Sequence, residues 1–194
     1  MQSPRVSYSD PMALLEDCFG PWKPISKAAG IAWLVAYALF LIYALADSSG
    51  FLFVDFVNLM IHEAGHPFFS WFGSYTLTIL GGTLGELIVP LLCAAAFFFR
   101  REIPGLAFSL FWFFENFLYI GTYMSDARAE ALPLVGNGDH DWNILFGQWN
   151  LLLQDTAIGR TTRLLGWLGM LATCAWLAWR TFRPAQPDDA QLTS

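Results

Sequence analysis

The long apolar runs of this sequence limit its fold more than any other feature. Residues 28–46 carry no charged side chain, and further apolar segments follow at residues 51–71, 83–99, 104–123 and 164–179. A helix needs roughly 20 mostly apolar residues to cross a bilayer core. Hydrophobic residues make up 56% of the chain and charged residues 13%, against about 25% charged residues in soluble domains. The sequence therefore predicts an all-α integral membrane bundle of four to six hydrophobic helices.

Polar segments flank this predicted bundle. Residues 1–27 are polar and interrupted by prolines, so we expect an interfacial N-terminal segment. The polar tail at residues 184–194 is expected to be disordered. Residues 1–183 would then form a single multi-pass membrane domain in the lipid bilayer. The net charge of −6 without a basic patch gives no indication of a nucleic-acid partner.

The second apolar segment contains the sequence His-Glu-Ala-Gly-His at residues 62–66. On a helix, His62 and His66 lie one turn apart on the same face. Two imidazoles so placed can hold one zinc ion, and the intervening glutamate can act on a water bound to it. The motif predicts a Zn²⁺ site with His62 and His66 as ligands and Glu63 as the catalytic base.

Two more polar residues extend the histidine face toward the start of that segment. Asp55, Asn58, His62 and His66 follow one another at spacings of three, four and four residues. Bare polar groups in lipid cost several kcal/mol, so this stripe should face the bundle interior. Asp55 and Asn58 are candidates to orient an imidazole or to line the path to the site. A plain helix–helix hydrogen bond is the alternative for Asn58.

The third metal ligand is expected from the loop at residues 136–142. This loop holds His140, the third histidine of the chain, between Asp139 and Asp141. His140 would complete a three-histidine site with water in the fourth position, whereas Asp141 or Asp139 would give two histidines and a carboxylate. The sequence leaves these alternatives open.

Two polar residues in later apolar segments are also candidates for the site. Glu86 and Asn116 lie in predicted membrane helices, where polar residues often serve function. Asn116 could hold a substrate backbone. Glu86 could support the site or be purely structural.

The segment between the motif and Glu86 changes its pattern. Polar and apolar side chains alternate at residues 74–79, and glycines stand on both sides. Alternation with glycine at the ends is typical of a strand. We therefore expect a short β-like hairpin after the motif helix.

Residues 57–90 resemble the site-2-protease class of intramembrane zinc metalloproteases, the M50 group. The resemblance rests on the His-Glu-Ala-Gly-His motif, a glycine-containing segment after it and a further apolar run. It implies a metallopeptidase that cleaves a peptide bond at or within the membrane. In that class an Asp of a later Leu-Asp-Gly sequence completes the metal site, and this chain has no Leu-Asp-Gly.

Segments spread over most of the chain also resemble a group of small bacterial membrane proteins. They are the motif itself, Leu-Gly-Gly at residues 80–82, Asp-Ala-Arg at 126–128 and His-Asp-Trp-Asn at 140–143. This second resemblance implies the inner membrane of a bacterial cell as the location, and it implies no activity.

Three functions fit these residues. The first is a zinc metallopeptidase acting on a membrane protein. The second is a zinc hydrolase of a lipid amide or ester, because the same site could serve a lipid-like substrate from the bilayer. The third is a non-catalytic metal-binding membrane scaffold, which would not need Glu63.

Overall fold

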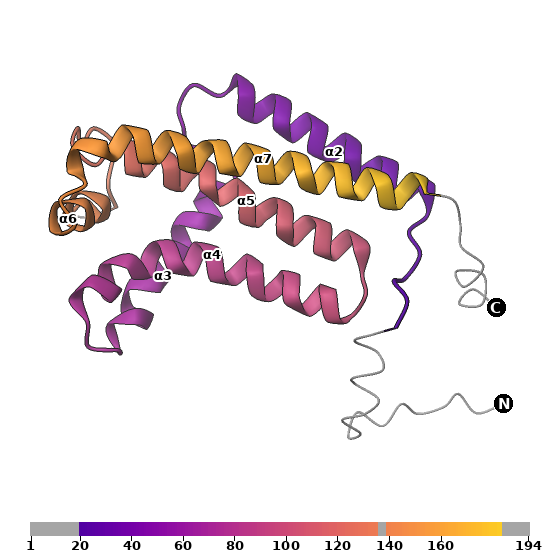
Figure 1. The fold of residues 1–194 in the computed structure, drawn as a ribbon, viewed down its shortest axis with the longest axis horizontal. Coiled ribbons are helices and arrows are strands. Elements are labelled where there is room, and N and C mark those ends of the chain that lie inside the picture. The colour runs from indigo at the N-terminus through magenta and orange to yellow at the C-terminus, as the bar shows by residue number, and fades with distance from the viewer. Residues whose placement is uncertain (1–19, 136–138, 184–194) are drawn as a thin grey trace.

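The computed structural model describes residues 20–135 and 139–183, and all the regular structure within them is helical. The all-α prediction is therefore confirmed for this part of the chain. The expectations for residues 1–19 and for the tail at 184–194 lie outside the described residues. Figure 1 shows the elements in chain order: α2 (Lys27–Ala46), α3 (Asp55–Ser70), α4 (Tyr75–Phe99), α5 (Ile103–Ser125), α6 (Asp141–Gln148), the short 3-10 helix η1 (Leu152–Gln154) and α7 (Asp155–Phe182).

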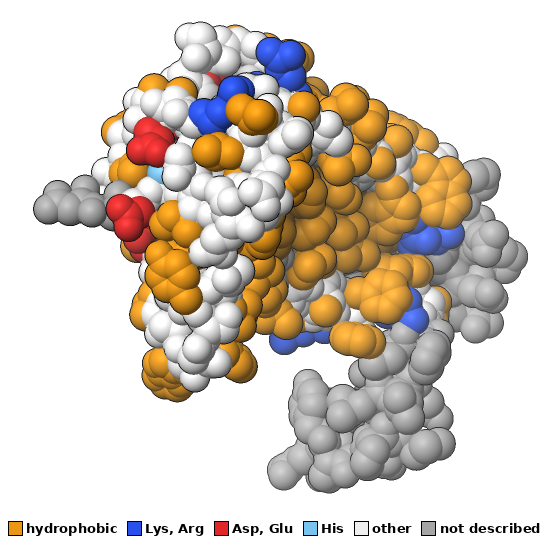
Figure 2. Space-filling model, turned by 60° about the vertical axis from the view of Figure 1, so that its left-hand side comes forward, with side chains coloured by type: hydrophobic (Ala, Val, Ile, Leu, Met, Phe, Trp, Pro, Cys, Tyr) orange, Lys and Arg blue, Asp and Glu red, His pale blue; other side chains and the backbone are white. Residues whose placement is uncertain are grey.

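Three of these helices, α2, α4 and α5, are long and apolar enough to cross a membrane. Large apolar side chains point outward from them, among them Leu45 on α2 at 71% exposed and Leu92 on α4 at 64%. Figure 2 shows hydrophobic side chains over much of the bundle surface. Apolar surface of this extent is rare on soluble monomers. The fold is consistent with a membrane protein.

The expected four to six membrane-crossing helices are not supported by this count of three. Helix α3 has 16 residues and is about 24 Å long, which is shorter than the roughly 30 Å hydrocarbon core. Helix α7 has 28 residues, but Asp155, Arg160 and Arg163 make its N-terminal part polar. The sequence prediction included these two segments among its hydrophobic helices because each contains a long apolar run.

The β-like hairpin predicted after the motif is wrong, because α4 begins at Tyr75 and runs through Gly81 and Gly82. The Ser74 hydroxyl accepts a hydrogen bond from the Leu77 backbone N–H and caps the first turn. The glycines serve a helix contact: a Cβ on Gly65 of α3 would overlap the carbonyl of Gly81. Small residues at such contacts let membrane helices pack closely. Helix α3 therefore lies directly against α4.

One end of the bundle joins three segments that are far apart in the sequence. The Lys23 Nζ atom, ahead of α2, lies 2.9 Å from Glu102 Oε1 in the α4–α5 turn. The Trp22 ring lies under the guanidinium groups of Arg101 and Arg180, at 5.1 and 5.5 Å from the ring centroid. The start of α2, the α4–α5 turn and the end of α7 thus meet at the end opposite α6 (Figure 1).

Candidate metal centre

His62 and His66 lie one turn apart on the face of α3 that packs against α4. Their ring centroids are 4.9 Å apart. His62 is buried and His66 is half-buried. Gly82 of α4 leaves space for the first of these rings, because a Cβ there would overlap the His62 imidazole. The close α3–α4 contact therefore fixes the position of the pair.

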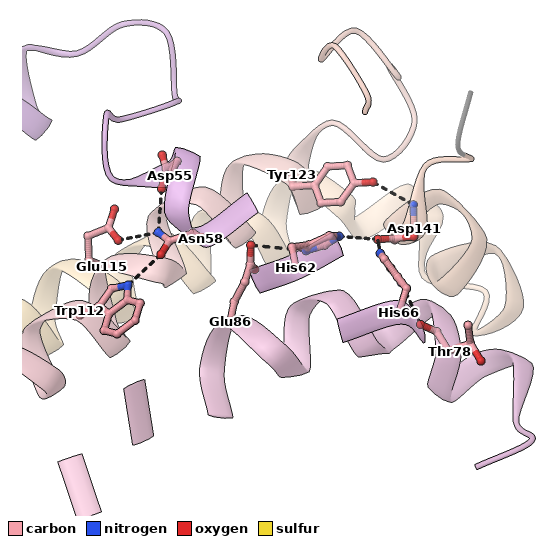
Figure 3. Close-up of polar contacts among 10 residues, drawn as sticks. All are labelled: Asp55, Asn58, His62, His66, Thr78, Glu86, Trp112, Glu115, Tyr123 and Asp141. Carbon is pink, nitrogen blue, oxygen red and sulfur yellow. Dashed lines mark hydrogen bonds and ion pairs between the residues drawn. The ribbon is translucent and has the colours of Figure 1, made fainter. Parts of the chain in front are cut away.

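Asp141, the first residue of α6, completes a group of three possible metal ligands. Its Oδ2 atom lies 2.9 Å from His62 Nε2 and 3.4 Å from His66 Nε2. All three ligand atoms are within 4.8 Å of one another (Figure 3). Two imidazole nitrogens and one carboxylate oxygen are a donor set that suits zinc. The group could hold a metal ion.

The other nitrogen of each imidazole faces a group on α4. His66 Nδ1 lies 2.9 Å from the carbonyl oxygen of Thr78, and His62 Nδ1 lies 3.4 Å from Glu86 Oε1. Because a carbonyl oxygen only accepts, His66 must carry its proton on Nδ1, and the Glu86 carboxylate favours the same tautomer for His62. When both imidazoles are neutral, as metal binding requires, their Nε2 atoms are left as acceptors that point toward Asp141 (Figure 3). Contacts of this kind orient histidine ligands in metal sites.

Asp141 is directed toward the histidines by the residues around the start of α6. His140 is the N-cap of this helix, and its Nδ1 accepts a hydrogen bond from the Asn143 backbone N–H at 3.2 Å. The Asn143 side chain donates to the carbonyl of Ala127 at 2.8 Å. The backbone N–H of Asp141 donates to the Tyr123 hydroxyl at 3.1 Å. The His-Asp-Trp-Asn segment thus supplies a cap, a possible ligand and an anchor within four residues.

The electrostatics around α6 agree with Asp141 as a possible ligand and with His140 as the helix cap. Burial acts to raise the pKa of Asp141, but hydrogen bonds in which His62 and His66 share a proton with its carboxylate outweigh the burial and hold that pKa below its ordinary value. Asp141 is therefore ionised at neutral pH, as a metal ligand must be. Burial lowers the pKa of His140. A neutral His140 can accept the hydrogen bond of its capping role.

Of the three alternatives for the third ligand, the structure brings Asp141 to the histidine pair. The His140 Nε2 atom instead lies 3.5 Å from Asp126 Oδ2, and its ring packs on Tyr123 with the centroids 4.1 Å apart. Asp139 is exposed and belongs to no metal-binding group found among the described residues. His140 therefore positions Asp141 and does not itself join the group.

The three possible ligands line a cavity of about 790 Å³. Glu63 lines the same cavity and is exposed to it. Its carboxylate forms no hydrogen bond or ion pair with another described residue. An unengaged carboxylate beside a metal site can exchange protons with a bound water or substrate. The structure thus places the predicted base and the histidines in one space.

Asp55 and Asn58 form a separate polar cluster with two residues of α5. The Asn58 amide nitrogen donates to Asp55 Oδ1 at 3.1 Å and to Glu115 Oε2 at 3.0 Å. Its amide oxygen accepts from the Trp112 indole N–H at 2.8 Å. None of the four lines the cavity of the metal centre. For Asn58 the structure therefore gives the helix–helix hydrogen bond that the sequence left as an alternative.

Asn116 is also placed away from the cavity. It is fully buried on α5, and its amide nitrogen donates to the carbonyl of Trp112 at 3.0 Å. It is not among the residues that line the cavity, so it is not positioned to hold a substrate there. Glu86, by contrast, lies beside His62 as expected for a residue that supports the site.

Two contacts of the site were missed from the sequence. The Thr78 contact uses a backbone carbonyl, which any residue would supply, so the side chain carries no signal. Tyr123 supports Asp141 through its hydroxyl, but in the sequence it is one of many aromatic residues in its segment. If residues 75–82 had been predicted as a helix, Thr78 would have been placed one turn before Gly82. Gly82 contacts His62 in the structure, so Thr78 would then have been expected near the histidines.

No protein-family model, curated protein or solved structure matches this chain. The resemblance to the site-2-protease class therefore stays a prediction. The function has to be argued from the residues of the site.

Proposed function

We propose that this protein is a membrane-embedded zinc-dependent hydrolase of an amide or ester bond. The proposal rests on the convergence of three acceptor atoms, His62 Nε2, His66 Nε2 and Asp141 Oδ2. Acceptors this close repel one another unless a cation or a shared proton lies between them. Two histidines and one carboxylate are the protein ligands of several hydrolytic zinc enzymes, which keep the fourth position open.

The residues around this position have separate roles in hydrolysis. A zinc ion held there would polarise the substrate carbonyl and activate a water near neutral pH. Glu63 takes a proton from the attacking water and returns it to the leaving amine or alcohol. It suits this role because it lines the same cavity as the ligands and is not engaged elsewhere. Glu86 keeps the His62 ring in the orientation that presents Nε2 to the metal.

The bond that is cleaved can be of two kinds. The resemblance to the site-2-protease class favours a peptide bond in a membrane protein, which would make the protein a metallopeptidase. The apolar cavity at the centre favours a lipid amide or ester. Both reactions use the same residues in the same roles.

We also propose a multi-pass arrangement in which α2, α4, α5 and α7 cross the membrane and α3 does not cross it fully. The two ends of the bundle differ in charge, and cytoplasmic ends carry more Lys and Arg. The end opposite α6 holds six basic residues: Lys23, Lys27, Arg100, Arg101, Arg180 and Arg183. This end would face the cytoplasm of a bacterial cell. The metal centre, near α6, would then face the outer side of the inner membrane.

Metal analysis and one substitution test the hydrolase proposal. Protein purified without chelators should contain one zinc ion per chain, and the His62→Ala variant should contain none. Glu63→Gln should keep the zinc and abolish hydrolysis. The assay uses liposomes of bacterial lipid extract that carry a single-span test peptide, and mass spectrometry follows the cleavage of peptides and lipids in them. A parent protein without zinc would overturn the proposal. If the parent and Glu63→Gln showed the same hydrolysis, that hydrolysis would not come from this site, and a metal-binding scaffold would be the remaining function.

A further inference from the structure

The cavity at the metal centre has a polar end and apolar walls. The polar end lies at the metal centre and contains Glu63 and the three possible ligands, while Ser49 and Asp139 are further polar residues of the lining. The apolar lining comes from several parts of the chain and includes Phe56, Leu59, Ile79, Leu132 and Leu134. A cavity of this kind suits a ligand with one polar group at the metal and a hydrocarbon part along the walls.

The size of the cavity sets a limit on what can occupy it. A helix with its side chains is about 10–12 Å wide and rises 5.4 Å per turn, so each turn fills roughly 420–610 Å³. The cavity of about 790 Å³ therefore holds fewer than two helical turns. Pairing with a strand edge is a common way to bind an extended peptide, and the described residues offer no strand for it. A single hydrocarbon chain needs neither the width of a helix nor a backbone partner.

The cavity also reaches the apolar surface of the bundle. Phe56 on α3 and Tyr75 on α4 both line it, and they are 65% and 62% exposed. Helix α4 is one of the helices able to cross a membrane, so in the membrane arrangement proposed above this surface lies beside the lipid. A chain that is already in the bilayer could enter here without passing through water.

We propose that the substrate is an acyl amphiphile, an N-acyl amide or O-acyl ester, whose hydrocarbon chain occupies this cavity and whose carbonyl lies between Glu63 and the metal position. The inference rests on the hydrolase function proposed above and specifies its substrate. One water is consumed: its oxygen bonds to the acyl carbon while the C–N or C–O bond breaks. One proton of that water passes by way of Glu63 to the leaving amine or alcohol, and the products are a fatty acid and the freed head group.

A series of straight-chain alkyl hydroxamates with two to twelve carbons tests this substrate class by binding alone. The hydroxamate group chelates zinc, and the alkyl chain probes the walls. Each buried methylene contributes about 0.8 kcal/mol, which is about a fourfold gain in affinity. Calorimetry on the zinc-loaded protein in lipid nanodiscs should show this gain per methylene up to a limiting length. The probes also partition into the nanodisc lipid. The heat of this partition is measured with the His62→Ala variant, which is expected to hold no zinc, and is subtracted from the heat measured with the parent.

A matched pair of variants on α3 locates the chain. Leu59 lines the cavity, whereas its neighbour Met60 does not and is 74% exposed. Leu59→Trp should move the limiting length to shorter chains, and Met60→Trp should leave it at the parent value. A series that is flat after subtraction, or equal behaviour of the two variants, would overturn the inference.

Hydrolysis then separates the sources of the acyl group. Octanoyl amides of aminocoumarin and octanoyl esters of methylumbelliferone distinguish an N-acyl from an O-acyl substrate, and turnover of either supports the inference. Turnover of a hydrophobic peptide without turnover of either acyl probe would overturn it and leave the hydrolase function intact. Zinc content is measured for every variant. Loss of zinc would count against the proposed function, whereas bound zinc without a chain-length dependence would count against the acyl substrate alone.

Discussion

Two polar clusters on the same stripe of α3 show how differently buried polar residues can be used. The first contains Asp55 and Asn58, and the second contains His62 and His66. In the first cluster the Asn58 side chain is fully paired within the protein: both Asp55 and Glu115 accept from it, and Trp112 donates to it. A buried polar network with these contacts joins helices and specifies their packing.

The second cluster directs its free atoms to one point. The Nδ1 atoms of both histidines are turned to α4, and their Nε2 atoms meet the Asp141 carboxylate. Acceptors face acceptors there, and the group opens on the cavity where Glu63 lies. One stripe therefore contains a closed structural cluster and an open group suited to a ligand. The two clusters thus differ in how their hydrogen-bonding capacity is used.

Breaking the closed cluster should give the largest loss of stability. Asn58→Leu removes the shared amide. The Trp112 N–H and the carboxyl groups of Asp55 and Glu115 then each lose their hydrogen bond to it. Each buried group left unpaired costs about 1–3 kcal/mol, so we expect a loss of roughly 3–5 kcal/mol. Thermal unfolding in detergent measures it, with Val57→Leu as the control because Val57 is 51% exposed on the same helix. An unfolding temperature equal to that of the parent would show that this cluster does not hold the helices together.

Breaking the open cluster should remove metal and leave the fold. Asp141→Ala takes away one of three ligands, so we expect zinc affinity to fall by more than the roughly 100-fold that loss of an outer contact can cause. The protein without metal should stay folded, because Trp142, Leu145 and Phe146 hold the same helix in a packed core. Asp139→Ala is the matched control, because Asp139 lines the same cavity but is not near the histidines. Equal zinc loss in both variants would contradict the assignment of Asp141.

One substitution made in both clusters sharpens the comparison further. Glu86→Gln keeps the shape of the side chain beside His62 but removes its charge, so zinc affinity should fall about 10–100-fold. Glu115→Gln is the same change on the closed cluster and should leave zinc affinity unchanged. Competition with a chromogenic chelator measures both. If Glu115→Gln lowered zinc affinity as much as Glu86→Gln, the two clusters would be one coupled unit.

Much of the site could be predicted from the sequence because the relevant signals are local. The spacing from Asp55 to His66 defines one helix face, and Asp141 was among the expected third ligands. The division of the stripe into two clusters could not be predicted, because Trp112 and Glu115 lie some fifty residues later. The start of α4 was misread because glycines were taken as turn residues, whereas in this bundle they allow two helices to touch.

The smallest expected effect distinguishes a capping residue from a ligand at His140. His140→Ala removes the hydrogen bond to the Asn143 N–H, and loss of an N-cap costs about 1 kcal/mol. Because the cap positions Asp141, zinc affinity should fall about fivefold, the equivalent of that energy. His140→Asn offers another capping oxygen and should restore most of the affinity. A ligand role predicts otherwise: both substitutions would then abolish zinc binding, and Asn would not rescue it. Zinc titration of the two variants side by side therefore decides whether α6 contributes one ligand or two.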